Sequence, residues 1–428
     1  MSTQTTEHTT ITPFKATRPG KDWQELLAKV LPPGRLPVPA AGVVVLRFAG
    51  SAVAASSFDY QTALMASHGQ GPTGAAGTAK VAHANGLYRT IREVLKVVPK
   101  DSDVTLSWEE FQGREALYVE VEGYRLAVPH SIAAAVEKVG LDKIENPSIL
   151  AGLERGPQVE VDVEEFIRSV DRVIPFASKD DVAPVLTCVQ IVIEGGKLTV
   201  YGTDRFRMAR ASMPVALLEA GDLGGQASAR ALIPGKEWPR LKKILAGGEF
   251  KLRLYGAQPT KTKEAEAVAM IGDEFEARVL CQEGKYPDLS TLFKDVTVDR
   301  VHVLIDGVGI QKAVQVIEAL APRATPMRLV STEDGDAVRI VATLEDGEVQ
   351  ESPRVDAIVT EAFDIAFKPT YYLSMLKALR AQRVRLSLCR PEPRKAVHLS
   401  DASVPMDQVT FEQLIMPLRL PSASDAQR

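Results

Sequence analysis

The sequence has little of what secreted, metal-binding or membrane-spanning proteins need. Its 428 residues include only three cysteines, at positions 188, 281 and 389. An odd number of widely separated cysteines offers neither a disulfide framework nor the spacing of a zinc site, which favours a reducing cytosol. No apolar run approaches the roughly 18 residues needed to cross a bilayer. The polar N-terminal segment lacks the apolar core of a secretory signal, so we expect no membrane association.

Motifs for catalysis and cofactor binding are equally scarce. The six histidines have no metal-ligand spacing and no nucleophile elbow is present, so we predict no metal, no cofactor and no catalytic residue. A formal glycine motif at Gly69, Gly71 and Gly74 contains Pro72 and precedes a strand-like run. We interpret it as a hairpin loop, and a cytosolic enzyme that binds a nucleotide there stays open as an alternative.

Charge of one sign is also missing. The chain has 51 basic and 55 acidic residues and a net charge of −4, which argues against a surface that is basic all over. It leaves room for a basic surface balanced by acidic surface elsewhere. The length suits two to four domains.

What the sequence does contain is one plan repeated roughly every 135 to 150 residues. Each repeat has an early helix-like segment, at 21–31, 163–174 and 309–320. Each has a later one, at 84–100, 234–248 and 369–383. Around them lie strand-like runs, at 42–48, 188–194, 197–202, 250–256, 275–281, 338–344 and 384–389. Many strands with two helices per repeat predict an α+β fold, with the helices packed on mainly antiparallel sheets.

The later helix-like segment of every repeat is basic. Each of the three has a net charge of +3, in a chain whose net charge is −4. One such segment is typical of a solvated helix face, but three at matching positions favour a shared surface that faces a polyanion. The residues predicted to face it are Arg89, Arg92, Lys96, Lys236, Arg240, Lys243, Lys377, Arg380 and Arg383.

Four stretches resemble the β subunit of bacterial DNA polymerase III, the replicative sliding clamp. They are YGTDRFRMAR at 201–210, CQEGKYPDLS at 281–290, PTYYLSMLKAL at 369–379 and FEQLIMPLRL at 411–420. The resemblance implies three clamp-type domains at 12–156, 157–297 and 298–420, the first divergent, followed by a flexible tail at 421–428. It also implies a head-to-tail homodimeric ring whose helices face double-stranded DNA without reading its sequence. Such a protein is non-catalytic, cytoplasmic and associated with the bacterial nucleoid.

The resemblance further implies a cleft between domains two and three that holds short peptides of partner proteins. The partners would be the DNA polymerase III α subunit, the clamp loader and other proteins with a clamp-binding motif. In the central stretch we expect an extended strand, with Arg205 and Arg207 on one side and Phe206 and Met208 on the other. Arg207 and Arg419 would bind carbonyl or acidic groups of the peptide. The positions that match the cleft are Leu186, Thr203, Arg205, Phe206, Arg207, Met208, Pro287, Leu292, Tyr371, Met416, Pro417, Leu418 and Arg419.

The sequence departs from the family pattern at four places. Phe58 and Asp59 stand where the second domain has Thr203 and Asp204, and the LPVPAAG stretch of the first domain is eroded. Arg205 stands where a small residue is common, and eight residues follow the final motif. These departures favour, as an alternative, a specialised clamp paralogue from a phage, a plasmid, or a repair or inhibitor-resistance locus. A peptide-binding scaffold that never encircles DNA is a further alternative.

Overall fold

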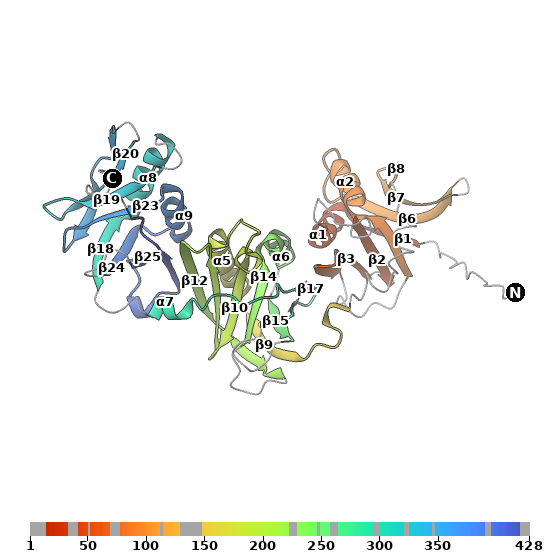
Figure 1. Ribbon diagram of the computed structural model, residues 1–428. Helices are drawn as coiled ribbons and strands as arrows, with labels where there is room; N and C mark the ends of the chain where they lie inside the picture. The colour runs from red at the N-terminus through yellow and green to blue at the C-terminus, as the bar shows by residue number, and fades with distance from the viewer. Residues whose placement is uncertain are drawn as a thin grey trace.

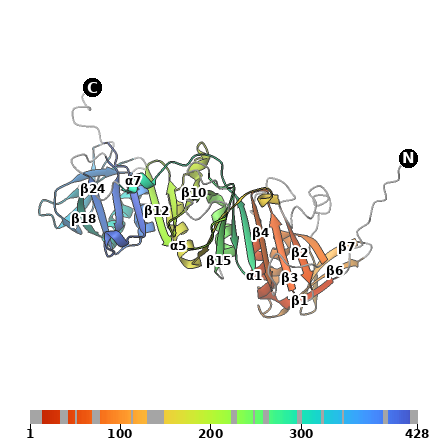
Figure 2. The same cartoon turned by 90° about the horizontal axis from the view of Figure 1, so that it is seen from below.

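The chain is an arc of three units that share one architecture (Figure 1). The computed structural model describes residues 14–32, 42–49, 52–68, 78–111, 114–128, 148–221, 229–245, 249–256, 264–294, 300–320, 325–344, 347–389 and 395–419. Apart from the short α7, the labelled helices lie along the concave side of the arc in Figure 1, and the strands fill the view from below (Figure 2). The α+β fold class predicted from the sequence is confirmed.

The first unit packs two helices together over its sheets. Its elements are β1 (Phe14–Pro19), α1 (Gly20–Val30), β2 (Val43–Ala49), β3 (Ala52–Phe58), β4 (Thr62–His68), β5 (Thr78–His83), α2 (Ala84–Val94), β6 (Asp103–Phe111), β7 (Arg114–Val121) and β8 (Tyr124–Ala127). Trp23 and Leu27 of α1 and Leu87 and Ile91 of α2 are buried in one core. This apolar spacing along each helix buries one face and leaves the other in solvent.

The second unit repeats the plan. Its elements are β9 (Arg155–Val161), α5 (Val163–Val173), β10 (Cys188–Glu194), β11 (Lys197–Thr203), β12 (Arg207–Pro214), β13 (Ala216–Glu219), β14 (Ala229–Pro234), α6 (Trp238–Leu245), β15 (Phe250–Tyr255), β16 (Ala267–Ile271) and β17 (Phe275–Leu280). Asp162 caps α5 by accepting a hydrogen bond from the Glu165 N–H (2.7 Å), which satisfies a free donor at the helix start.

The third unit follows a short helix, α7 (Ser290–Lys294). Its elements are β18 (Arg300–Asp306), α8 (Gly307–Leu320), β19 (Met327–Ser331), β20 (Ala337–Thr343), β21 (Val349–Glu351), β22 (Val355–Val359), β23 (Asp364–Phe367), α9 (Pro369–Leu379), β24 (Arg383–Cys389), β25 (Val397–Asp401) and β26 (Phe411–Ile415). Its core stacks Phe367 on Tyr372, with ring centroids 5.0 Å apart.

The sheets run across both joints between units. At the first joint, β4 pairs antiparallel with β17, so that Ala66 lies opposite Phe275. At the second joint, β12 pairs antiparallel with β26, so that Arg207 lies opposite Ile415. Backbone hydrogen bonds therefore fix the angle between successive units as firmly as they fix strands within one unit.

The predicted helices exist but the basic ones are shorter than expected. Helix α2 ends at Val94, α6 begins at Trp238 after a 3₁₀ turn, and α9 ends at Leu379. Four of the basic residues predicted on these helices therefore lie beyond them, namely Lys96, Lys236, Arg380 and Arg383. All seven strand-like runs are strands. The glycine motif at 69–74 and the tail at 421–428 lie outside the described residues.

Candidate functional site

The turn between β11 and β12 is organised by one carboxylate. Asp204 Oδ1 accepts hydrogen bonds from the N–H groups of Phe206 and Arg207, both 3.1 Å long. Arg205 adopts a left-handed conformation with φ of 79°. The predicted alternation along a strand is therefore wrong, because an aspartate that bonds two and three residues ahead makes a turn instead. Arg205 and Phe206 are exposed at its tip, whereas Arg207 and Met208 are buried.

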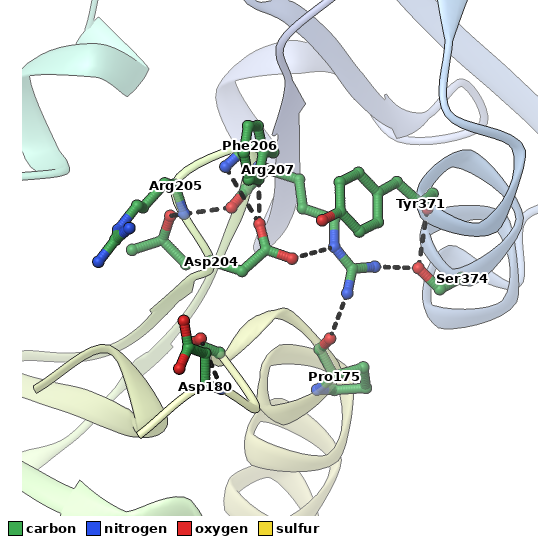
Figure 3. Close-up of polar contacts among 10 residues, drawn as sticks. Pro175, Asp180, Asp204, Arg205, Phe206, Arg207, Tyr371 and Ser374 are labelled. Carbon is green, nitrogen blue, oxygen red and sulfur yellow. Dashed lines mark hydrogen bonds and ion pairs between the residues drawn. The ribbon is translucent and has the colours of Figure 1, made fainter. Parts of the chain in front are cut away.

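Arg207 ties the second unit to the third (Figure 3). Its Nε donates to Asp204 Oδ2 (2.9 Å), and its terminal nitrogens donate to the Pro175 carbonyl (2.7 Å) and to Ser374 Oγ. Its guanidinium carbon lies 4.8 Å from the centre of the Tyr371 ring. All three nitrogens are engaged and the side chain is 10% exposed. Arg207 therefore bridges two units in this structure, and its binding of a partner peptide stays a prediction.

An exposed aromatic pair stands beside this arginine. The Phe206 ring, 54% exposed, stacks on Tyr371 with centroids 5.9 Å apart and planes at 28°. Lys368 Nζ lies 4.7 Å from the Tyr371 ring centre. Phe206 and Tyr371, both labelled in Figure 3, therefore present aromatic surface at the second joint. The Lys368 ammonium lies beside this surface.

The C-terminal segment crosses the same joint. The Met416 N–H donates to the Phe206 carbonyl and the Leu418 N–H donates to the Ala366 carbonyl, each at 2.8 Å. One segment is thus pinned to a turn of the second unit and to strand β23 of the third. The side chains of Met416 and Leu418 are nevertheless exposed, at 41% and 40%.

A compact apolar cluster lies under the turn. Leu186 and Met208 are buried there with Leu289 and Leu414. The cluster also contains Cys188, whose thiol is free and whose pKa burial raises to about 11, so that it is protonated near neutral pH.

The remaining predicted cleft positions differ in exposure. Thr203 is buried, and its Oγ1 donates to the Arg207 carbonyl and accepts from the Arg205 N–H. Leu292 is 44% exposed, Pro287 and Arg419 are exposed, and Pro417 is half-buried.

Sequence reasoning missed three residues at this joint: Lys368, Ser374 and Leu414. Ser374 follows Tyr371 by three residues on α9, which places both on one helix face. Leu414 lies within the quoted C-terminal motif, at an alternating position of β26. Helical and strand periodicity could therefore have found two of the three.

A buried ionic group lies in the same seam between β12 and β26. Arg210 pairs with Glu412, which also accepts from His398 Nε2 (3.1 Å). Burial lowers the pKa of His398 below its ordinary value. Burial acts to raise the pKa of Glu412, but the bond to His398 and the charge of Arg210 together hold that pKa below its ordinary value.

The residues predicted to face a polyanion fall into three groups. Arg89, Lys236, Lys243, Lys377, Arg380 and Arg383 are exposed and form no ion pair within the described residues. Arg92 and Lys96 are also exposed, but both pair with Glu93, at 3.2 and 2.6 Å.

Arg240 forms the third group alone. Its guanidinium donates to Asp59, to Glu237 (2.9 Å) and to the Leu31 carbonyl (3.3 Å), and the side chain is 13% exposed. The prediction that Arg240 faces a polyanion is therefore wrong, because two buried carboxylates hold it in the first joint.

Two searches of the described part of the chain gave negative results. No group of three histidine, cysteine, aspartate or glutamate side chains there is arranged to hold a metal ion. No helix there is long and apolar enough to cross a membrane.

Two family models match this chain, and each match covers one of the structural units described above. Residues 160–288 match the model of the DNA polymerase III beta subunit central domain, and residues 298–419 match the model of its C-terminal domain. Together these matches cover more than half of the chain.

Curated relatives agree with this family. The beta sliding clamp of Streptomyces coelicolor is 31% identical over 60% of this chain and 65% of its own length, slightly less than two thirds of that protein. The beta sliding clamp of Micrococcus luteus is 25% identical over 74% of this chain and 91% of its own length. The beta sliding clamp homolog GriR of Streptomyces muensis is 25% identical over 89% of this chain and 92% of its own length.

Solved structures show the same fold at lower identity. A DnaN sliding clamp from Pseudomonas aeruginosa, solved bound to griselimycin, superposes with a TM-score of 0.75 at 18% identity, covering 95% of this chain and 99% of that one. A DNA polymerase sliding clamp from Caulobacter crescentus gives 0.72 at 18% identity, with 95% and 100% covered. By its two domain matches and its curated relatives, the chain belongs to the DNA polymerase III beta subunit family, the beta sliding clamps.

Proposed function

We propose that two copies of this chain close head to tail into a ring around double-stranded DNA. The ring is a non-catalytic processivity factor that tethers a DNA polymerase in the bacterial cytoplasm, at the nucleoid. In this proposal the units are the domains 12–156, 157–297 and 298–420. The observation that carries it is the way strands meet at the two joints.

Both joints follow one rule of strand pairing. The third strand after the first helix of one unit pairs with the last strand of the next unit, β4 with β17 and β12 with β26. Within the described residues, the matching strands at the ends of the arc have one neighbour each: β21 pairs with β20, and β8 pairs with β7. A second copy that pairs its β8 with this β21 repeats the rule and closes the ring.

Apolar surface at the two ends supports this closure. A hollow of about 600 Å³ lies between α2 and β8, lined by Val94, Val97, Tyr124 and Leu126 among others. At the other end, α8 exposes Val308, Val316 and Leu320. A soluble monomer rarely leaves such large apolar side chains together, so a second copy is the natural cover for both ends.

The concave face supports the choice of duplex DNA as ligand. Lys236, Lys243 and Lys377 are exposed beside or on the helices of that face (Figure 1). Duplex DNA carries one charge per roughly 1.7 Å of its axis, so scattered cations hold it through phosphates without reading bases.

The second joint supports a peptide cleft. Phe206, Leu292, Met416 and Leu418 expose apolar side chains there, and Tyr371 is half-buried. Apolar anchors of an extended peptide draw most of their affinity from surfaces of this kind. The partners are the DNA polymerase III α subunit, the clamp loader and other proteins with a clamp-binding motif.

A topological experiment tests the ring. The protein is loaded on nicked circular DNA with clamp loader and ATP, the complex is isolated, and the DNA is then cut. We expect retention on circles and loss from linear ends, and a Tyr124→Asp variant should fail to be retained. Equal retention on both forms of DNA would contradict encirclement.

A specialised paralogue is the second candidate. The alignment with GriR covers 89% of this chain, against 60% for the Streptomyces coelicolor clamp, and so extends into the divergent first unit. Replacement of the replicative clamp gene in a host tests this candidate. Full growth on this protein alone would argue against a purely specialised role.

A further inference from the structure

We propose that Arg207 and Ser374 are positioning residues that couple the candidate peptide surface to the second joint. Through them, a bound peptide and the angle between the second and third units stabilise each other. The inference rests on the proposed function, because it concerns how the peptide cleft of that proposal responds to its ligand. Neither residue needs to touch the peptide for this role.

The aromatic pair at the second joint has one ring from each unit. Phe206 belongs to the β11–β12 turn of the second unit, and Tyr371 belongs to the first turn of α9 in the third (Figure 3). At the first joint the neighbouring ring pair, Phe58 and Tyr60, has centroids 5.2 Å apart and lies within one unit. The stack of Phe206 on Tyr371 therefore depends on the angle between two units, and the pair at the first joint does not.

A chain of hydrogen bonds connects the two sides of this pair. Arg207 Nε donates to Asp204 Oδ2 (2.9 Å) in the second unit, and another of its nitrogens donates to Ser374 Oγ in the third. The Ser374 hydroxyl in turn donates to the Tyr371 carbonyl (2.8 Å). The chain thus leads from the carboxylate that organises the turn to the backbone that carries the Tyr371 ring.

Arg207 also contacts aromatic rings on both sides of the joint. Its guanidinium carbon lies 4.8 Å from the centre of the Tyr371 ring and 5.0 Å from that of Phe176, a buried residue of the second unit. A cation at such distances is attracted to the face of a ring. Burial, and after it the charge of Asp204, raise the pKa of the Tyr371 phenol, and the charge of Arg207 acts against them. The electrostatic field of the turn therefore reaches this ring.

Phe206 is fixed to its own side of the joint. Its N–H donates to Asp204 Oδ1 (3.1 Å), and its carbonyl accepts from the Met416 N–H (2.8 Å). Because its backbone is held at both ends, the Phe206 ring has little freedom to follow Tyr371. A change in the angle between the units would therefore separate the two rings.

The coupling group is shielded from solvent although the ring pair is accessible. The side chains of Arg207 and Asp204 are 10% and 12% exposed, whereas Phe206 is 54% exposed. Hydrogen bonds of charged groups are stronger in such surroundings than in water. The group can therefore hold the two rings in register without being part of the surface that a peptide covers.

A ligand that needs both rings favours the arrangement in which they stack. Peptide binding should therefore strengthen the second joint, and a stronger joint should raise peptide affinity by the same factor, since a coupling between two equilibria is reciprocal. A ligand that touched one unit alone would leave the joint unchanged.

A double-mutant cycle on peptide affinity tests the coupling. Fluorescence anisotropy gives the Kd of the full chain for a labelled clamp-binding peptide of the DNA polymerase III α subunit. For Ser374→Ala we expect a loss of roughly three- to tenfold, part of the value of one hydrogen bond to a charged group. Ser374→Thr keeps the hydroxyl and should lose little. In a Phe206→Ala background, Ser374→Ala should have almost no further effect, because the ring pair is already lost.

A second serine provides the matched control. Ser212 lies on β12, the strand that begins at Arg207, and its hydroxyl hydrogen-bonds with that of Thr199 (3.1 Å) inside the second unit. Ser212→Ala removes one partly buried hydroxyl, as Ser374→Ala does, but leaves the coupling group intact. It should leave the Kd unchanged.

Hydrogen exchange measures the joint itself. With saturating peptide, the backbone amides of β12 and β26, whose pairing forms the joint, should exchange more slowly than in the free chain. The slowing should be smaller in Ser374→Ala at the same peptide occupancy. The paired strands β15 and β16 lie inside the second unit and should exchange at one rate throughout.

Three results would overturn the inference: an unchanged Kd for Ser374→Ala, losses that add in the double variant, or exchange at β12 and β26 that peptide does not slow. A loss in Arg207→Lys that Ser374→Ala does not share would indicate direct contact of Arg207 with the peptide, and would overturn it too. If the wild-type chain does not bind the peptide, the cleft of the proposed function fails, and the inference fails with it.

Discussion

The two joints between units are built on the same turn. At the first joint, Asp59 Oδ1 accepts from the N–H groups of Gln61 (3.0 Å) and Thr62 (2.7 Å), and Tyr60 has φ of 72°. The second joint repeats this with Asp204 and with φ of 79° at the next residue. The correspondence of these two positions, predicted from the sequence, is confirmed by their geometry.

The joints differ in where the bridging arginine comes from. At the first joint, Arg240 of α6 reaches back to Asp59 in the turn. At the second joint, Arg207 of the turn reaches forward to Ser374 of α9. At the first joint the bridging arginine comes from the unit opposite the turn, and at the second joint it comes from the turn itself. The residues beside the two turns can therefore differ.

The residues beside each turn determine whether the surface of the joint is buried or exposed. Beside the first turn, Gln61 Nε2 donates to the Leu280 carbonyl (2.6 Å), and Glu237 is buried and accepts from Thr62 Oγ1 (2.9 Å). Beside the second turn stand Phe206 and Tyr371, stacked and accessible. One fold element therefore places a buried ionic group beside the turn at the first joint and a stacked Phe206–Tyr371 pair beside the turn at the second, which is the docking surface of our proposal.

Removal of Arg240 should have the largest effect. Arg240→Met leaves Asp59 and Glu237 buried without a cation, which we expect to reduce the free energy of unfolding by about 3–5 kcal/mol. Urea denaturation measures it. The double change of Arg240→Met with Asp59→Asn should recover part of the loss, and an unaltered unfolding midpoint in the single variant would contradict a sealed ionic joint.

Removal of Arg207 should have a smaller effect, since it faces one carboxylate. For Arg207→Met we expect a loss of about 1.5–3 kcal/mol, the usual range for hydrogen bonds to a charged group. The Arg207→Lys variant keeps the charge but not the three-way bonding, so it should recover little. If Arg240→Met and Arg207→Met reduced the free energy of unfolding equally, the number of buried carboxylates would not explain the difference between the joints.

The third largest effect should be on peptide affinity, which we expect to depend on the second turn and not on the first. Phe206→Ala should weaken a labelled clamp-binding peptide by about 2 kcal/mol, or roughly thirtyfold, as for a hot-spot aromatic. Gln61→Ala, at the matching position of the first turn, is the control and should leave binding unchanged. Fluorescence anisotropy reads both, and similar losses would rule out a cleft specific to the second joint.

The smallest effect concerns pH at the second joint. The pKa of His398 is lowered on folding, so the unfolded chain takes up a proton first as pH falls below about 6.5. Stability should therefore fall between pH 7 and pH 5 in the wild type, and less steeply in His398→Gln. Glu412, whose pKa is lowered, contributes stability above its ordinary pKa and loses it only in stronger acid. Parallel pH curves for the two proteins would argue against His398 as the source.

Much of the fold follows from sequence periodicity. Apolar residues at helical spacing in 21–31 and the short, nearly continuous apolar run at 188–194 mark segments that must be buried, and both became the expected elements. Helix ends were less predictable, because a left-handed residue such as Arg380 ends α9 where a glycine would have been the usual signal.

The candidate site was less predictable than the fold. Arg240 and Asp59 are 181 residues apart, and no local pattern tells a paired arginine from a free one. The turn at Asp204 overrode the alternation expected around Arg205 because a side chain competed with the strand.

The rule of strand pairing has a consequence for how tightly each joint holds. At β4–β17 and at β12–β26 the two partners belong to one chain, so the linker keeps them at a high effective concentration and dilution cannot part them. The proposed pairing of β8 with β21 of a second copy has no linker, and it must repay the lost translational and rotational freedom from contacts alone. The three joints would share one pattern of strand pairing, but only the joint between copies would depend on protein concentration. The proposed ring would therefore open at that joint, because of the entropy of association and not because of a different geometry.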